Sequence, residues 1–389
     1  MNKNEYKNTI LLIEHFCLKE DLSSYDPYDI WKSKTGVKIK KHYFKNKFLG
    51  FLPATFLTLT DFYLVNKSRF LLKPQEYPIV RAQAGISLIN LYLKTSNKEY
   101  LDFARIHLDW LLLNHSKNYS GLCWGTGFKI VINSKTVYDE NTPFTTNTPY
   151  ILEFFHAFYK ITQEQTIRNA ILSIYNFYEK DIIILKETDE LMITSYGTFA
   201  DRIVTNSVSY TMFAYSIFYQ YMDNKPYIES KIKKLYNFIC SVQQIDGSWI
   251  YAPYDENSFI DCFHSCFILK NLIKTSQVIS LDNSNYIIDK GYSRIRESFY
   301  CKKTGLFNRF ISQNKPSIVK YDLYDNSEVL NVAILLNDVK TINSLTDSIF
   351  INFIRENDIF SLIDLLGFRK NKNTLRWAAM PYLMTISNL

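Results

Sequence analysis

Apolar positions along the chain recur with helical spacing, and short polar turns separate the segments that carry them. A helix rich in small residues is followed by a polar turn, a second helix, and in several units a loop with glycine and an aromatic residue. Five helix pairs are predicted in this way, followed by a last helix at 375–386: 82–93 with 99–113, 150–161 with 165–178, 210–222 with 227–243, 261–273 with 286–299, and 327–336 with 342–354.

The first helices of these units start near residues 82, 150, 210, 261, 327 and 375, a period of about 50 to 65 residues. A single pair leaves an apolar face in water, and stacking neighbouring pairs buries that face. Six starts within 389 residues favour a closed ring over an open solenoid. We therefore predict an all-α fold, an (α/α)6-type toroid in a single domain over 1–389. Residues 81–389 supply the hairpin repeats, 1–80 form a helical segment that packs on the ring or completes it, and short β-hairpins are predicted around 129–134 and 183–193.

The composition is that of a globular protein, with 47% hydrophobic and 21% charged residues, and it excludes a long disordered region. The formal charge of +7 is scattered along the chain, which predicts no nucleic-acid partner, since such proteins concentrate basic charge on one face. One short basic cluster is interpreted as a solvated face, with Lys38, Lys40, Lys41, Lys45 and Lys47.

The most apolar segment, 48–65, contains Pro53 and Asp61 and is predicted to be a buried helix rather than a membrane span. The first 18 residues lack the apolar core of a signal peptide, and the six cysteines include no CxxC pair. These features predict a cytoplasmic protein with reduced thiols and without a metal. The sequence also lacks a P-loop, a dinucleotide fingerprint, HExxH and GxSxG, so no cofactor is predicted.

Loops that join one pair to the next are expected to gather at one end of the ring. The loop at 244–251 holds Asp246, Trp249 and Tyr251, and it leads to Asp261 and His264 at the start of the next helix. The spacing of three places Asp261 and His264 on one helical face, where a carboxylate orients an imidazole and raises its basicity. Two structural alternatives stay open: Trp249 as a staple between helices, and Asp261 as a helix-start residue.

A second group of polar and aromatic residues surrounds the loop at 124–148. Trp124 and Phe128 suit the apolar face of a sugar ring, and Asn147 suits its hydroxyls, although Asn147 is also typical of a helix cap. A third group holds Tyr196, Arg202 and Asn206; Arg202 is suited to a carboxylate or phosphate, or to a surface pair with Asp201. Further polar groups at equivalent repeat positions are Tyr321, Asp322, Arg376 and Trp377.

In order along the chain, these segments resemble VpsJ-like α/α-toroid proteins of bacterial exopolysaccharide, capsule and O-antigen biosynthesis clusters. The similarity lies at 25–29, which includes Asp26 and Asp29, at 123–125, 141–143 and 147–148, and at 246–249 with 260–264. It implies a role in surface-glycan assembly. A saccharide, or a lipid-linked or nucleotide-linked glycan, would be the ligand, and glycosyltransferases of the same pathway would be further partners. Related toroids include glycosidases, polysaccharide lyases and sugar epimerases.

Two kinds of sugar chemistry fit these residues. Hydrolysis needs two carboxylates, with Asp26, Asp29, Asp246, Asp261 and Asp322 as candidates. Lyase or epimerase chemistry needs a His or Tyr base beside an Arg, and the basic excess favours it on an acidic sugar, as in a uronyl epimerase or lyase. A glycoside hydrolase and a non-catalytic glycan-binding or scaffold component are the alternatives. The predicted catalytic residues are His264, Asp261, Tyr196, Arg202 and Asp246, and the predicted substrate contacts are Trp124, Phe128, Trp249, Tyr251, Asn147, Asn206, Tyr321, Asp322, Arg376, Asp26 and Asp29.

Overall fold

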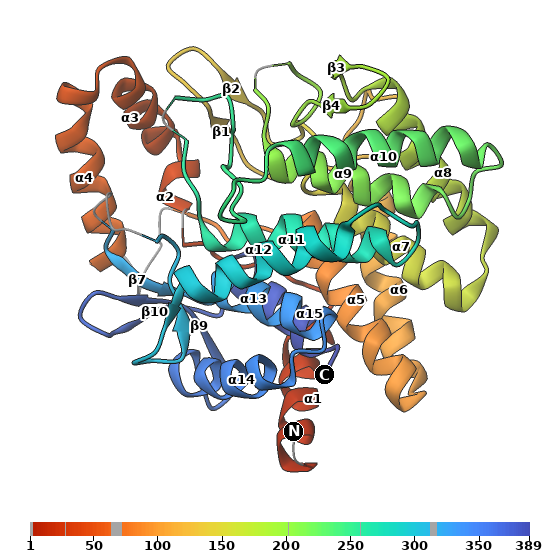
Figure 1. The fold of residues 1–389 in the computed structure, drawn as a ribbon. Helices are drawn as coiled ribbons and strands as arrows, with labels where there is room; N and C mark the ends of the chain where they lie inside the picture. The colour runs from red at the N-terminus through yellow and green to blue at the C-terminus, as the bar shows by residue number, and fades with distance from the viewer. Residues whose placement is uncertain (1–2, 28, 64–71, 201, 257, 312–316) are drawn as a thin grey trace.

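The chain folds into a ring of helical hairpins in two layers (Figure 1). The computed structural model describes residues 3–27, 29–63, 72–200, 202–256, 258–311 and 317–389. Each inner helix packs on the next, and the last packs on the first, which confirms the predicted (α/α)6 toroid. The inner helices are α5 (Pro78–Thr95), α7 (Thr148–Thr162), α9 (Thr205–Phe218), α11 (Cys262–Ser276), α13 (Leu323–Leu335) and α15 (Met380–Ile386), and their outer partners are α6 (Lys98–Leu113), α8 (Gln165–Lys180), α10 (Lys225–Ser241), α12 (Ser284–Ser298) and α14 (Val339–Phe353).

The two ends of the chain close the ring. Helix α1 (Lys3–Cys17) lies against both α5 and α15, and the two termini lie near each other (Figure 1). Cys17 Sγ is 3.8 Å from Met380 Sδ. Asn90 Nδ2 donates to Ser387 Oγ at 2.9 Å, and Lys94 Nζ donates to the Ser387 carbonyl at 2.9 Å. Side chains of α5 therefore hold the end of the chain in place.

The inner helices are buried because neighbours cover them on every side. All 14 residues of α9 are buried, and the hydroxyl groups of Ser209, Thr211 and Ser216 bond to carbonyls of the preceding turn, as Thr211 does to Ser207 at 3.2 Å. Helices α5 and α7 approach closely at Gly85, where a Cβ would lie 2.2 Å from Phe154 Cζ. Small residues in the inner helices thus allow the ring to close tightly.

Two tryptophans fasten loops to the outer layer. Trp124 Nε1 donates to the Leu111 carbonyl near the end of α6 at 3.0 Å, and Trp249 Nε1 donates to the Ile239 carbonyl near the end of α10 at 3.0 Å. Both indoles are buried, with exposed fractions of 0% and 2%. Equivalent positions in two repeats therefore have the same structural role, which is the staple alternative considered for Trp249.

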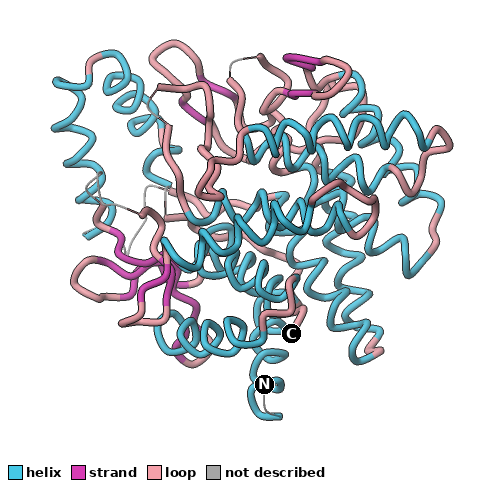
Figure 2. Tube along the Cα trace, in the orientation of Figure 1, coloured by secondary structure: helices cyan, strands magenta, loops and turns pink. Residues whose placement is uncertain are grey.

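Short antiparallel strands occupy the loops (Figure 2). Hairpins β1 (Ile130–Val131) with β2 (Val137–Tyr138) and β3 (Ile184–Glu187) with β4 (Met192–Thr194) confirm the two predicted positions. The sequence pattern did not reveal a third hairpin or a four-stranded sheet of order β10-β9-β7, with β8 paired to β9. These strands are β5 (Tyr300–Cys301), β6 (Leu306–Phe307), β7 (Val319–Asp322), β8 (Ile354–Arg355), β9 (Asp358–Asp364) and β10 (Arg369–Lys372).

The N-terminal region also forms a helical hairpin outside the ring. The short helix α2 (Asp29–Lys32) leads to α3 (Lys34–Lys45), and Asn46 alone joins α3 to α4 (Lys47–Tyr63). The prediction of a buried helix at 48–65 is wrong for its described part, because α4 packs on α3 and most of its large apolar side chains stay exposed; residues 64 and 65 lie outside the described ranges. Within the described ranges, no helix has the length and apolar character needed to cross a bilayer.

Candidate functional site

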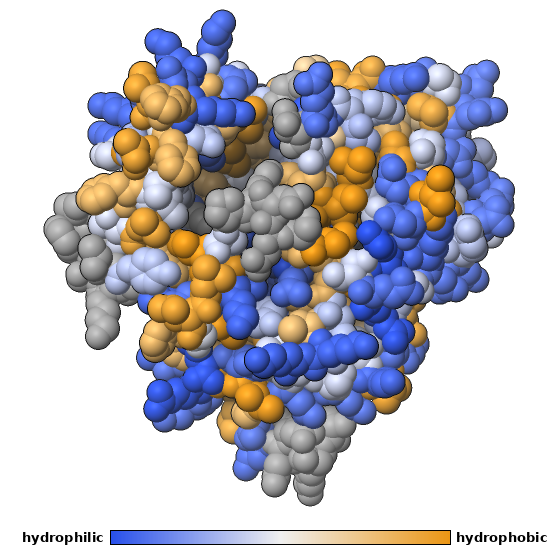
Figure 3. Space-filling model, turned by 60° about the vertical axis from the view of Figure 1, so that its left-hand side comes forward, coloured by the Kyte–Doolittle hydropathy of each residue, from blue (hydrophilic) through white to orange (hydrophobic). Residues whose placement is uncertain are grey.

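The loops before the inner helices meet at one end of the ring, which we call the mouth. Backbone bonds link consecutive loops: Thr145 N donates to the Tyr196 carbonyl at 3.0 Å, and Thr205 N donates to the Tyr251 carbonyl at 2.9 Å. Farther round, Phe263 N donates to Asp325 Oδ1 at 3.1 Å. The expected gathering of loops is therefore present, and a hollow is visible on the side of the molecule that carries α2 to α4 (Figure 3).

Asp261 and His264 form a dyad at the start of α11. Asp261 is the N-cap, and its carboxylate accepts from His264 N at 3.3 Å and lies 2.8 Å from His264 Nδ1. The Asp261 side chain is only 2% exposed, whereas that of His264 is 18% exposed. The carboxylate fixes Nδ1 as the protonated nitrogen, and Nε2 bonds to no other group in the described parts of the chain. The imidazole is thus oriented and keeps one free nitrogen.

Tyrosines stand beside this dyad. The Tyr251 ring lies 4.4 Å from the imidazole and 5.3 Å from the guanidinium of Arg202. Burial and the neighbouring Tyr196 hold the pKa of Tyr251 well above its ordinary value, so its phenol stays protonated at neutral pH. Arg202 Nη2 donates to Asp255 at 2.7 Å, in a pair whose side chains are 30% and 44% exposed. The structure therefore brings four predicted residues, His264, Tyr251, Arg202 and Tyr196, into one neighbourhood.

Next to the dyad, one arginine serves two buried carboxylates. Arg309 Nη2 is 2.9 Å from Asp322 Oδ2, and Arg309 Nε is 3.1 Å from Asp325 Oδ2. Burial raises the pKa of Asp325 to about 8 and also raises that of Asp322, against the opposing effect of Arg309. Since two buried carboxylates share one cation, the pair holds a proton near neutral pH. Neither side chain is more than 1% exposed.

The rings of Trp377, Tyr324 and Phe263, which we call the aromatic shelf, lie beside these carboxylates. Trp377 stacks on Tyr324 with ring centroids 4.6 Å apart and planes 13° apart, and its Nε1 donates to Asp322 Oδ2 at 2.9 Å. Phe263 meets Trp377 edge to face at 5.8 Å. Trp377 is half-buried, so part of its surface is accessible. An accessible indole above polar groups suits the apolar face of a sugar ring.

Charged groups of α2 and of the turn before it lie beside Arg376, the neighbour of Trp377. Asp26 pairs with Arg376 and lies 3.4 Å from Lys32 Nζ, which also donates to Asp29 at 3.0 Å. Lys32 Nζ lies 4.4 Å from the centre of the Phe128 ring, and burial lowers the pKa of Lys32 to about 8. Four predicted contacts, Asp26, Asp29, Phe128 and Arg376, are thus gathered by a lysine that the sequence did not indicate.

The remaining predicted site residues make contacts within the fold rather than at the dyad. Trp124 and Trp249 are too buried to stack on a sugar, which corrects both predictions in favour of the staple role. The carboxylate of Asp246 accepts from Ser248 in its own turn and pairs at 2.9 Å with Arg294 of the outer helix α12. Asn147 precedes α7 without capping it through its side chain, and Asn206 is buried in the first turn of α9.

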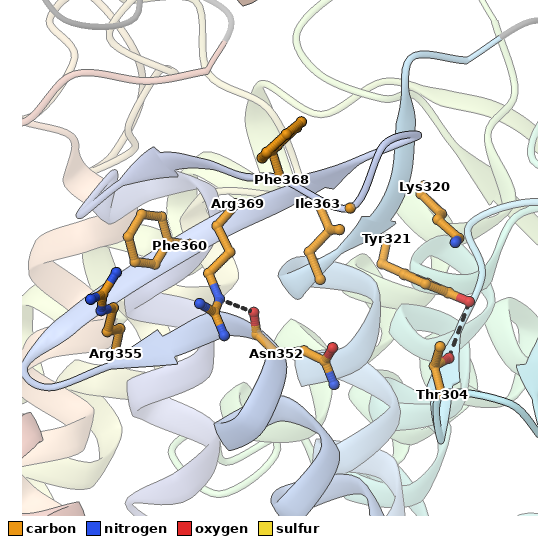
Figure 4. A pocket seen from close by; sticks show the side chains of 10 residues that line it. Thr304, Lys320, Tyr321, Asn352, Arg355, Phe360, Ile363, Phe368 and Arg369 are labelled. Atoms are coloured by element: carbon orange, nitrogen blue, oxygen red, sulfur yellow. Dashed lines mark hydrogen bonds between the residues drawn. The ribbon is translucent and has the colours of Figure 1, made fainter.

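Tyr321 faces a different cavity (Figure 4). This cavity, of about 520 Å³, lies between α14 and the four-stranded sheet, and Lys320, Arg355 and Arg369 contribute its charges. The Tyr321 hydroxyl bonds to Thr304 at 3.1 Å and to Cys301 Sγ at 3.2 Å, outside the ring. Because successive residues of a strand point to opposite faces, Asp322 reaches the mouth while Tyr321 does not.

Arg309 and Lys32 are the main site residues that sequence reasoning missed. Each is a single basic residue in a stretch without a recognisable motif. The only sequence signal was the pair Asp322 and Asp325, which repeats at α13 the spacing of Asp261 and His264 at α11. Among the described residues, no three His, Cys, Asp or Glu side chains gather so that they could hold a metal ion.

Comparison with known proteins adds evidence on the fold. No family model and no curated protein matches the sequence. Among solved structures, the cellobiose 2-epimerase from Bacillus thermoamylovorans B4167 is similar with a TM-score of 0.63 at 12% identity, covering 80% of this chain and 87% of that chain. A D-mannose isomerase gives 0.60 at 14% identity over 94% of this chain and 100% of that chain, and a family 88 glycosyl hydrolase from Bacteroides vulgatus gives 0.57 at 9% over 94% and 99%. The chain therefore shares its six-hairpin α/α-toroid fold with enzymes that process carbohydrates.

Proposed function

We propose that this protein is a carbohydrate-processing enzyme that transfers a proton on a saccharide bound at the mouth, as an epimerase, isomerase or lyase does. The observation that carries the proposal is the dyad of Asp261 and His264, with Nε2 of the imidazole unoccupied beside an aromatic shelf. The fold shared with a cellobiose 2-epimerase and a D-mannose isomerase supports the same class of chemistry.

In this proposal His264 Nε2 removes a proton from a sugar carbon next to a carbonyl or carboxylate group. Asp261 keeps the imidazole in the required tautomer and stabilises the imidazolium that forms. Tyr251, which stays protonated, is placed as a donor of a proton or a hydrogen bond to the sugar. Trp377 would hold the apolar face of the sugar ring, as indole rings do in sugar sites.

Hydrolysis by paired carboxylates has less support from the geometry. Such a mechanism needs two carboxyl groups that reach the glycosidic bond from either side. Asp322 and Asp325 are buried and bound to Arg309, and Asp26 is bound to Arg376 and Lys32. These carboxyl groups therefore already have basic partners within the protein, which disfavours them as a hydrolytic pair.

An acidic sugar remains our preferred substrate, and Arg202 is the residue best placed for its carboxylate. The pair of Arg202 with Asp255 is partly exposed, and exposed pairs contribute only about 0 to 1 kcal/mol, so a substrate carboxylate can replace Asp255 at low cost. The role in bacterial surface-polysaccharide assembly, and with it a cytoplasmic location, is supported by the sequence resemblance.

The test is exchange of sugar protons with solvent. Saccharides that carry a reducing end or a uronate are incubated with the protein in D2O, and deuterium incorporation is followed by NMR. We expect exchange with the wild type, none with His264→Gln, and a loss of about 10² to 10⁴-fold with Asp261→Asn. The matched control is His156→Gln. His156 lies on α7, where its imidazole bonds to the Tyr221 hydroxyl, and this variant should catalyse exchange like the wild type.

Two outcomes would contradict this assignment. Exchange that persists in His264→Gln would remove the proposed base. Release of new reducing ends without deuterium incorporation would instead favour the hydrolase alternative, and saccharide binding without any turnover would favour the binding or scaffold alternative.

A further inference from the structure

The most unusual surface of the molecule is the outer side of α4. A stripe of large apolar side chains follows one helical face at intervals of three and four residues. Its first three members are more exposed than buried, with Phe48 at 88%, Leu52 at 74% and Phe56 at 70%. Leu59 and Tyr63, each 41% exposed, continue the same stripe. Exposed apolar patches of this kind mark interaction surfaces in stable proteins.

Helices α3 and α4 of this hairpin pack closely together through a one-residue connection. A Cβ at Gly50 would lie 2.3 Å from Tyr43 Cα, so the glycine lets α4 approach α3 closely. Asn46 joins the two helices alone, and its side chain accepts from Leu49 N at 3.1 Å. The exposure of the stripe therefore follows from the packing of the hairpin itself.

A second segment, distant in sequence, extends this apolar surface. The turn between β9 and β10 exposes Leu365 at 50%, Leu366 at 75% and Phe368 at 62%. Lys370 on β10 lies with Nζ 5.1 Å from the centre of the Tyr63 ring at the end of α4, which places the two segments side by side. Figure 3, which brings this side forward, shows apolar side chains gathered over this region.

The charges around this surface identify its partner. Residues 34–60 contain no acidic residue and carry six lysines. Lys45 and Lys47 flank Asn46 at the tip of the hairpin, whereas Lys34 and Lys38 line a cavity with Phe128. Two copies of the chain placed face to face would bring like charges together, which opposes dimerisation through this surface. Anionic lipid headgroups complement the lysines, and the acyl region accepts phenylalanine and leucine, as at interfacial helices.

We propose that the α3–α4 hairpin, together with the turn between β9 and β10, docks the protein on the surface of an anionic membrane. The stripe of α4 enters the headgroup and acyl boundary, while Lys45 and Lys47 at the tip of the hairpin contact phosphate groups. Docking in this way leaves the ring outside the bilayer. It does not depend on the chemistry proposed for the mouth.

The test is co-sedimentation of the full-length protein with lipid vesicles. We expect binding to vesicles of phosphatidylcholine mixed with phosphatidylglycerol, weaker binding to phosphatidylcholine alone, and a further loss at high salt. The variant Leu52→Glu/Phe56→Glu should bind about tenfold more weakly or worse, because two side chains no longer leave water. Lys45→Glu/Lys47→Glu should lose the preference for anionic lipid.

The control is Leu93→Glu, which places the same charge on an apolar residue of α5 that is 65% exposed, and it should bind like the wild type. Circular dichroism establishes that each variant is folded. Equal vesicle binding by the wild type and Leu52→Glu/Phe56→Glu would overturn the proposal, as would no binding by the wild type. A wild-type dimer that becomes a monomer in Leu52→Glu/Phe56→Glu, without vesicle binding, would assign the surface to a second copy of the chain instead.

Discussion

An ion pair inside the ring gives a sharp test of how the inner helices are held together. Lys270 of α11 and Glu328 of α13 lie with Nζ 2.8 Å from Oε2, and their side chains are 2% and 0% exposed. Lys270 Nζ also donates to the Tyr150 hydroxyl of α7 at 2.9 Å, and that hydroxyl shares a 2.8 Å bond with Tyr210 of α9. Four consecutive inner helices therefore meet at this one charge.

We expect Lys270→Met to lower the free energy of unfolding by about 3 to 5 kcal/mol, because Glu328 then stays buried without a counter-charge. Removing both charges in Lys270→Met/Glu328→Leu avoids that penalty, so the double variant should be more stable than Lys270→Met alone. Urea unfolding followed by tryptophan fluorescence and by circular dichroism measures both effects.

The matched control is the exposed pair of Lys234 and Glu187, which has the same 2.8 Å separation with side chains 20% and 42% exposed. Lys234→Met should cost only about 0 to 1 kcal/mol, since water solvates the remaining carboxylate. A cost below about 1 kcal/mol for Lys270→Met, or costs that simply add in the double variant, would refute the argument from burial.

Three further predictions concern packing, protonation and the aromatic shelf. Gly85→Ala should destabilise the protein by about 1 to 3 kcal/mol, because the alanine Cβ would lie 2.2 Å from Phe154 Cζ. This clash outweighs the better helix propensity of alanine. Higher stability of the variant in denaturant unfolding would contradict the prediction. Burial raises the pKa of Asp325 from 3.8 to about 8, so the folded state keeps a proton that the unfolded state releases. Wild-type stability should therefore fall relative to Asp325→Asn as pH rises from about 4 to about 8, and parallel melting temperatures across that window would rule it out. Trp377→Ala should weaken saccharide binding about tenfold in calorimetry, and unchanged affinity would exclude the indole from the sugar site.

The sequence predicted the repeats because their signal is local. Apolar spacing and polar turns determine each hairpin, and the even distribution of hairpins implied closure. The contact of Asp261 with His264 was also predictable, since three residues along a helix fix it. The exposure of α4 was not predictable. Apolar spacing indicates that a segment forms a helix, but it does not indicate which other element packs against that helix.

The rest of the mouth depends on closure of the whole ring. Arg309 reaches Asp322 and Asp325 from the loop before β7, and Lys32 reaches Phe128 across nearly a hundred residues of chain. No local pattern marks such residues. The burial of Trp124 and Trp249 likewise emerged only in three dimensions, since glycine-tryptophan turns suit either a staple or a sugar platform.

The contact between α15 and α5 also sets the order of events during synthesis. The bond from Asn90 to Ser387 spans 297 positions, so α5 leaves the ribosome long before its partner exists. Until then the nascent chain is an open stack with one uncovered flank, and contacts between such distant positions form slowly. Helix α15 completes the circle, so a chaperone that shields α5 would act during the interval before α15 emerges.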